Sequence, residues 1–167
     1  MTVLPMPCQL ILYPMPNRTL RLDDFLPYRL SFTSNLVSET VAGTYQSLFD
    51  LRIPEWRVIA VVAEHEGISQ LDIGLRTRMD KVTVSRAAIA LVARGLIERS
   101  SKPNDRRSHR LRLSASGREL YAQVAPKALE LERRIFAALS PAELEALKST
   151  LRKIDAILAA DEENGPA

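Results

Sequence analysis

Apolar residues recur at helical spacing along most of the chain. Between residues 25 and 49 they form two stripes, so the predicted helix needs a packing partner on each of two faces. Pro54 begins a second predicted helix and Gly67 follows its end, which is the usual placement of proline and glycine around a helix. The chain between residue 25 and Gly67 is therefore predicted to be largely helical.

The next segment predicts two short helices joined by a tight turn. Asp80 is a strong N-cap for the second helix, and Met79 and Val84 stand at the two positions of a hydrophobic staple. Gly95 ends that helix. Gly74 is unfavourable inside the first helix, which is understandable if the second helix crosses closely at this point. The pair is predicted to be a helix-turn-helix.

After Gly95 the apolar spacing changes from that of a helix to that of a strand. The segments "LIERSS" and "HRLRLS" are predicted strands, joined by "KPNDRR". In the second strand Leu111 and Leu113 are expected to face inward, and Arg110 and Arg112 outward. A hairpin directly after a helix-turn-helix describes a winged helix.

Two long amphipathic helices complete the chain. The first is expected to be capped by Ser114 or Ser116, and the second begins at a capping box formed by Ser140 and Glu143. The predicted fold is all-α with a small β-wing, a winged helix-turn-helix flanked by N- and C-terminal dimerisation helices. The predicted organisation is an extended N-terminal arm (1–22), a helical dimerisation region (23–52 and 115–160), a winged helix-turn-helix DNA-binding domain (53–114) and a disordered tail (161–167).

The charge of the chain is unevenly distributed. Residues 76–112 hold eleven Lys or Arg and three Asp or Glu, whereas the whole chain carries a formal charge of only +3. A concentrated basic segment indicates a surface that binds a polyanion such as nucleic acid, and a solvated charged face is the alternative. The single cysteine, Cys8, excludes a disulfide within one chain and, with no apolar run of membrane-spanning length, suits a cytoplasmic protein without membrane association.

In a winged helix the second helix of the helix-turn-helix enters the major groove of DNA. Arg86 is the best candidate for a bidentate contact with guanine, Val82 or the methyl group of Thr83 could contact a thymine methyl, and Ser85 could donate to a phosphate. Partial core packing is the alternative for Val82. The expected DNA-binding residues on the helix and the wing are Lys81, Val82, Thr83, Ser85, Arg86, Lys102, Arg106, Arg107 and Arg110. Asp105 is expected to shape the turn of the wing.

The segment "MDKVTVSRAAIALVARGLIERSSKPNDRRSHRLRLSASG" resembles the MarR family of bacterial transcription regulators. Its matching elements are Asp80-Lys81, Val84-Ser85-Arg86, Leu91, Gly95-Leu96-Ile97, Arg99, Asp105-Arg106-Arg107 and Leu113-Ser114-Ala115-Ser116-Gly117. Ser114 stands where the family usually has threonine. The resemblance implies a homodimer on double-stranded operator DNA, and many members are repressors released by small aromatic or phenolic ligands.

The resemblance also implies an effector site between the dimerisation helices and the winged domain, where an aromatic acid or its thioester would bind. The residues expected to line it are Tyr28, Arg29, Phe32, Leu36, Trp56 and Arg57; an aromatic cluster in the core is the alternative. Cys8 lies ahead of the first helix, in contrast to the peroxide-sensing cysteines of some members.

Two other classes of function remain open. An enzyme is disfavoured because the only histidines, His65 and His109, have no nucleophile motif or metal-ligand spacing near them, and we expect neither a cofactor nor a metal. A ligand-independent architectural or antagonist DNA-binding protein would share the same fold and basic surface.

Overall fold

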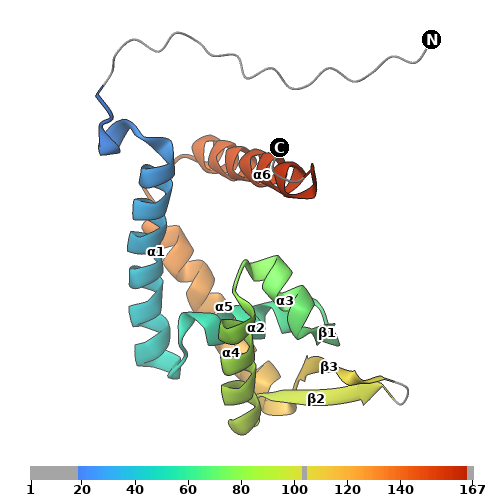
Figure 1. Ribbon diagram of the computed structural model, residues 1–167. Helices are drawn as coiled ribbons and strands as arrows, with labels where there is room; N and C mark the ends of the chain where they lie inside the picture. The colour runs from blue at the N-terminus through green and yellow to red at the C-terminus, as the bar shows by residue number, and fades with distance from the viewer. Residues whose placement is uncertain (1–18, 103–104, 165–167) are drawn as a thin grey trace, which may run out of the picture. The chain divides into compact units, whose positions relative to one another are not determined.

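The computed structural model describes the fold of residues 19–102 and 105–164, and the side chains of residues 19–100 and 110–160 (Figure 1). It divides into two compact units, one ending at Leu36 and one beginning at Val37. The boundary falls within the long helix α1 (Leu26–Phe49). Most of the predicted N-terminal arm lies outside the described residues.

The first unit contains a 3₁₀ helix, η1 (Leu22–Asp24), followed by the beginning of α1. Asp23 and Asp24 therefore precede the long helix instead of beginning it, with Phe25 in an extended conformation between the two elements. The reason is Pro27, which has no amide hydrogen and is accommodated only in the first turn of a helix.

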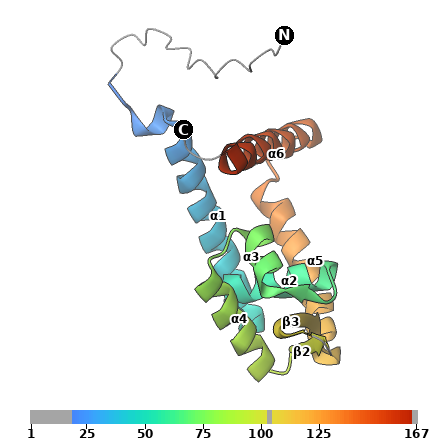
Figure 2. The ribbon, with the colours of Figure 1, turned by 45° about the vertical axis from the view of Figure 1, so that its right-hand side comes forward.

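The second unit holds the elements of a winged helix and two C-terminal helices. They are α2 (Ile53–Glu64), β1 (Ile68–Ser69), α3 (Gln70–Thr77), α4 (Lys81–Ala93), β2 (Ile97–Lys102), β3 (Asp105–Leu113), α5 (Ala115–Ile135) and α6 (Pro141–Asn164). Helices α3 and α4 lie beside one another with a short turn between them (Figures 1 and 2). The predicted fold class, mostly helical with a small wing, is confirmed.

The sheet has three antiparallel strands in the order β1-β3-β2. Ile97 pairs with Leu113 across β2 and β3, and Ile68 pairs with Leu111 across β1 and β3. Leu111 and Leu113 are buried as predicted. The short strand β1 was not predicted from the sequence.

One hydrophobic core joins α2, α3, α4 and the sheet. Its fully buried side chains are Leu51, Val58, Val62, Ile59, Ile73, Val84, Leu91, Ile97, Leu111 and Val124. A row of three aromatic rings extends this core: Trp56 lies 5.3 Å from Tyr45 and 5.8 Å from Tyr121, measured between ring centroids. The core fixes α3 and α4 on the sheet.

The C-terminal helices begin at the predicted caps. The hydroxyl of Ser114 accepts a hydrogen bond from the Gly117 amide at 3.0 Å and donates one to the Gly95 carbonyl at 2.6 Å. At α6, the Glu143 carboxylate accepts from the Ser140 amide at 2.8 Å, which completes the capping box. Helix α6 continues to Asn164, so the prediction of a disordered tail was wrong for residues 161–164, which extend its last turn.

Candidate nucleic-acid interface

The turn between α3 and α4 is fixed by one left-handed residue and one cap. Arg78 ends α3 with φ 53° and ψ 24°. The Asp80 carboxylate then accepts hydrogen bonds at 2.9 Å from the amides of both Val82 and Thr83, and at 2.6 Å from the Thr83 hydroxyl. These bonds, that of the Thr83 hydroxyl foremost, lower the pKa of Asp80. Asp80 is therefore the predicted N-cap of α4, and it engages the hydroxyl of Thr83.

Helix α4 has a buried face and an exposed face. Val84, Ala87, Ala88 and Leu91 are buried. Lys81, Val82 and Arg86 are exposed, whereas Thr83 and Ser85 are half-buried. The side chain of Val82 is 55% exposed, so it does not belong to the core. The first two turns of α4 thus present two cations and one apolar side chain to the surroundings.

The hairpin places its basic residues differently from the prediction. Lys102 pairs with Asp105, so Asp105, Arg106 and Arg107 lie in β3 rather than in the connecting segment. An irregularity between Ser101 and Lys102 shifts the register at this end of the ladder. The side chains of Lys102, Asp105, Arg106 and Arg107 lie outside the described residues, so their contacts with DNA stay predictions.

Arg110 links the base of the wing to the segment before α3 through a hydrogen bond. It is half-buried, and its Nη1 donates to the Gly67 carbonyl at 2.9 Å. Its Nε is buried and has no hydrogen-bond partner in the described part of the chain. The Ser69 hydroxyl, donating at 2.7 Å, is the main cause of a lowered pKa at Asp72, and the positive charge of Arg110 adds to it. Arg110 thus has a structural contact in addition to its predicted contact with phosphate.

A buried carboxylate links the far end of α4 to the corner before α2. Glu55 accepts hydrogen bonds from the Arg52 amide and from Arg52 Nη2, both at 2.8 Å. Arg94, which follows α4, donates to the carbonyls of Asp50 at 2.8 Å and Phe49 at 3.4 Å, and lies 3.9 Å from Glu55. This cluster was missed in the sequence. The only local signal was the three-residue spacing of Arg52 and Glu55, and arginine is not a usual N-cap.

Comparison with known proteins shows which family has this helix-turn-helix and hairpin. A sequence profile of the MarR family matches residues 49–108, which hold the helix-turn-helix and most of the hairpin. The chain belongs to the MarR family. It is a transcriptional regulator of that family, whose members bind DNA and dimerise.

Three relatives of this MarR-family chain illustrate the match. The transcriptional regulator HosA of Escherichia coli O111:H- is 26% identical over 119 residues, which are 71% of this chain and 88% of HosA. The transcriptional repressor MprA of Escherichia coli K12 is 29% identical over 102 residues, 61% of this chain and 58% of MprA. The crystal structure of CouR from Rhodococcus jostii RHA1, bound to p-coumaroyl-CoA, superposes with a TM-score of 0.72 at 23% identity, covering 81% of this chain and 95% of that one.

The residues predicted to bind an effector fall in both units of the regulator. In the first, Tyr28 lies 5.9 Å from Phe32 between ring centroids, and Arg29 lies 5.5 Å from the Phe32 ring and 3.5 Å from the Asp23 carboxylate. Leu36 is exposed. In the second unit Trp56 is half-buried in the aromatic row and Arg57 is exposed. A common effector site for these residues stays a prediction.

The described residues hold neither a candidate metal site nor a membrane-spanning helix. They contain no group of three or more His, Cys, Asp or Glu side chains that could hold a metal ion. None of the helices in the described ranges is long and apolar enough to cross a membrane.

Proposed function

We propose that this MarR-family regulator binds operator DNA with the first two turns of α4 in the major groove. The division of α4 into a buried apolar face and an exposed face with Lys81, Val82 and Arg86 carries the proposal. A recognition helix meets base edges with its N-terminal residues, and these are the residues that α4 leaves exposed.

Each side chain in the first two turns of α4 that is not buried suits a particular contact. The planar guanidinium of Arg86 matches the two acceptors on the major-groove edge of guanine, and Val82 matches a thymine methyl. Lys81 and Ser85 would bind phosphate. Thr83 retains its methyl group for an apolar contact, because its hydroxyl donates to Asp80.

The wing would lie over the neighbouring minor groove. There Arg106 and Arg107 would meet the negative potential of a narrow groove, with Lys102 and Arg110 as further phosphate contacts. Such contacts strengthen binding without specifying a sequence.

The regulator would act as a homodimer. Large apolar side chains are exposed on helices of both units, and such exposure commonly marks a surface that a partner covers. They include Leu26, Leu30, Phe32 and Leu36 in the first unit, and Leu147, Leu151, Ile157 and Leu158 on α6. A second copy would cover them and place two copies of α4 about one DNA turn apart, ~34–36 Å.

We further propose that the regulator is a repressor released by a small aromatic or phenolic compound, an acid or its thioester. Two comparisons support this class: MprA is a repressor, and CouR binds p-coumaroyl-CoA. Tyr28, Phe32 and Trp56 offer aromatic surface, and Arg29 or Arg57 could pair with a carboxylate.

Selection of operators from random duplex DNA tests the proposal. We expect an enriched pseudo-palindrome with half-sites about 10 bp apart and affinity that falls steeply with salt. Uniform weak binding without an enriched site would refute a sequence-specific regulator and favour an architectural DNA-binding protein. Aromatic acids and their thioesters would then be screened for release of the selected site, and failure of every compound would contradict the effector proposal alone.

A further inference from the structure

Arg52 stands at the N-cap of α2 although its side chain cannot cap the helix. A guanidinium carries only hydrogen-bond donors, whereas the amides of a first helical turn need an acceptor, which serine, threonine, aspartate or asparagine usually supplies. The chain has such a cap at α6, where the Ser140 hydroxyl accepts from the Glu143 amide at 3.3 Å. Helix capping therefore does not account for an arginine at position 52.

A buried carboxylate holds the guanidinium of Arg52 in place. Glu55 Oε1 accepts from Arg52 Nη2 at 2.8 Å and from Nε at 3.2 Å. Glu55 is buried, but the Arg52 side chain remains 66% exposed. These bonds engage two of the five N–H groups of a guanidinium, which leaves donors for an acceptor outside the protein. A side chain that is fixed beforehand loses less conformational freedom when it binds.

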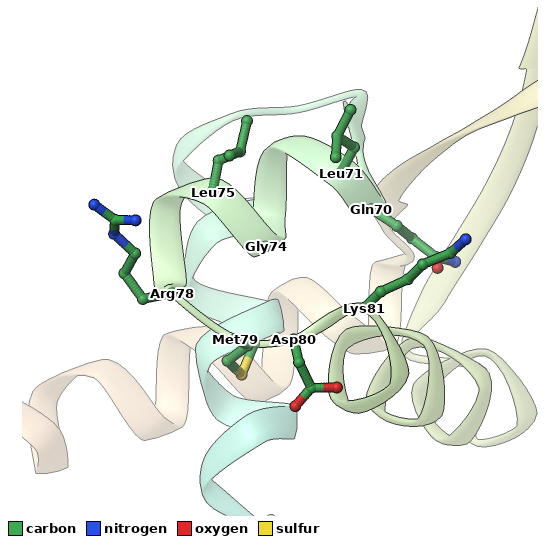
Figure 3. A pocket seen from close by; sticks show the side chains of 8 residues that line it. All are labelled: Gln70, Leu71, Gly74, Leu75, Arg78, Met79, Asp80 and Lys81. Carbon is green, nitrogen blue, oxygen red and sulfur yellow. The ribbon is translucent and has the colours of Figure 1, made fainter. Parts of the chain in front are cut away.

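The same side chain borders the exposed face of α4. A small hollow of about 120 Å³ lies between the beginning of α2 and α4, and Arg52, Thr83 and Arg86 are among the residues that line it. Successive residues of a helix are about 100° apart, so Thr83 and Arg86 lie on one flank of the exposed face and Lys81 on the other. Figure 3 shows Lys81 extending from the beginning of α4 toward Gln70 of α3. Arg52 thus stands on the flank of α4 opposite Lys81.

The charge around Arg52 is positive on balance. Arg86 lines the same hollow, and Arg94 lies 3.9 Å from Glu55. The carboxylates that act on Arg52 are those of Glu55 and Asp50, so three cations stand against two anions. Arg94 is committed to the carbonyls of Phe49 and Asp50, which leaves Arg52 as the exposed cation at this corner. An exposed guanidinium in positive surroundings suits a phosphate, which it can bind through two parallel hydrogen bonds.

We propose that Arg52 binds a backbone phosphate of the operator, with Glu55 as its positioning residue. The inference rests on the proposed function, in which α4 lies in the major groove. That groove is about 12 Å wide and a helix with its side chains is about 10–12 Å across, so a phosphate backbone passes along each flank of the helix. Lys81 meets one backbone and Arg52 the other. Such a contact specifies no sequence, so it strengthens binding to every operator variant alike.

Substitution of Arg52 separates this role from a structural one. Arg52→Ser gives α2 the pattern of the α6 cap, a serine three residues before a glutamate, so the unfolding midpoint should equal or exceed that of wild type. The same variant should bind the selected operator about tenfold more weakly at about 0.1 M salt, and its slope of log affinity against log salt should be smaller by about one. The enriched operator sequence should stay the same.

Two further variants and a control test the charge itself. Arg52→Gln is neutral but can still donate to Glu55, and it should lower the slope as much as Arg52→Ser does. Arg52→Lys keeps a cation and should keep the slope. Lys127→Ser is the control, because Lys127 also pairs with a glutamate three residues away, at 2.9 Å on α5, and should change neither affinity nor slope.

Neutral methylphosphonates at single positions of the operator locate the contact. One position in each half-site should weaken binding of wild type about tenfold and leave Arg52→Ser unaffected, because that protein already lacks the partner. Equal slopes for wild type and Arg52→Ser, affinities that follow the unfolding midpoint instead of the charge at position 52, or methylphosphonates that weaken both proteins alike at every position would each overturn the inference. An enriched operator with any of these results rejects the Arg52 contact alone, whereas selection without an enriched operator rejects the proposed function.

Discussion

Replacement of Glu55 by alanine should destabilise the protein substantially. Glu55 is 4% exposed and accepts hydrogen bonds from the amide, Nη2 and Nε of Arg52 at 2.8, 2.8 and 3.2 Å. Hydrogen bonds to a charged group contribute about 1.5–3 kcal/mol, and an ion pair with a largely exposed partner such as Arg52 adds only about 0.2–1 kcal/mol. The expected loss is therefore about 2–4 kcal/mol.

The assay is the midpoint of thermal unfolding, followed by circular dichroism at pH 7 and at one protein concentration, because dimerisation makes the midpoint depend on concentration. In a chain of this length 1 kcal/mol corresponds to about 2–4 °C, so Glu55→Ala should unfold about 4–16 °C below wild type. Glu143→Ala is the matched control, since it removes the corresponding carboxylate from an exposed capping box. A decrease no larger than that of the control would refute the reasoning.

The pH dependence gives the sign of the effect. Burial on its own raises the pKa of Glu55, but the hydrogen bonds from Arg52 and the charges of Arg52 and Arg94 outweigh it and lower the pKa. A lowered pKa in the folded state contributes stability above the unfolded value, about 4.3, and this contribution is lost as the pH falls through the folded pKa. The midpoint difference between wild type and Glu55→Gln should thus be larger at pH 7 than at pH 3, and an equal difference at both would contradict the assignment.

Three further predictions concern the recognition helix, the wing and two glycines in the long helices. Arg86→Ala should weaken operator binding by about 1–3 kcal/mol and relax one base position; if it binds every operator variant as wild type does, the assignment of α4 is wrong. Arg107→Ala should lower the slope of affinity against salt by about one, and an unchanged slope would remove the wing arginine from the interface. Gly117→Ala should lower the unfolding midpoint because its Cβ would meet the Leu96 carbonyl, whereas Gly43→Ala has open space and should stabilise by up to about 1 kcal/mol; equal midpoints for the two variants would contradict this packing.

The helix-turn-helix could be predicted from the sequence because its determinants are local. Asp80 caps the helix that it precedes, Met79 and Val84 are five residues apart, and Gly95 adopts a positive φ of 68° at the end of α4. Gly74 was expected at a close crossing, and the Met79 carbonyl lies next to it. Each of these interactions joins residues within one or two helical turns, so the order of residue types reveals it.

The features that the sequence did not reveal depend on distant partners. Strand β1 has only two residues and is defined by pairing with β3 at Arg110 and Leu111; two residues are too few to show an alternating pattern. The contact of Arg94 with Asp50 likewise joins positions 44 residues apart. Arg110 was assigned to DNA from its outward position in a strand, whereas its hydrogen bond to Gly67 depends on where β1 lies.

The contacts of α4 restrict how an effector can change its exposed, DNA-facing side. Asp80 fixes the first turn through three hydrogen bonds, and Arg94 ties the last turn to the carbonyls of Phe49 and Asp50. The buried face between them includes Val84 and Leu91, which close packing holds in one arrangement. A rotation of α4 inside the winged helix would break the contacts of Arg94 and the packing of the buried face together. An effector can therefore change DNA binding in two ways: it can displace the winged helix as a whole, or it can cover the exposed face of α4.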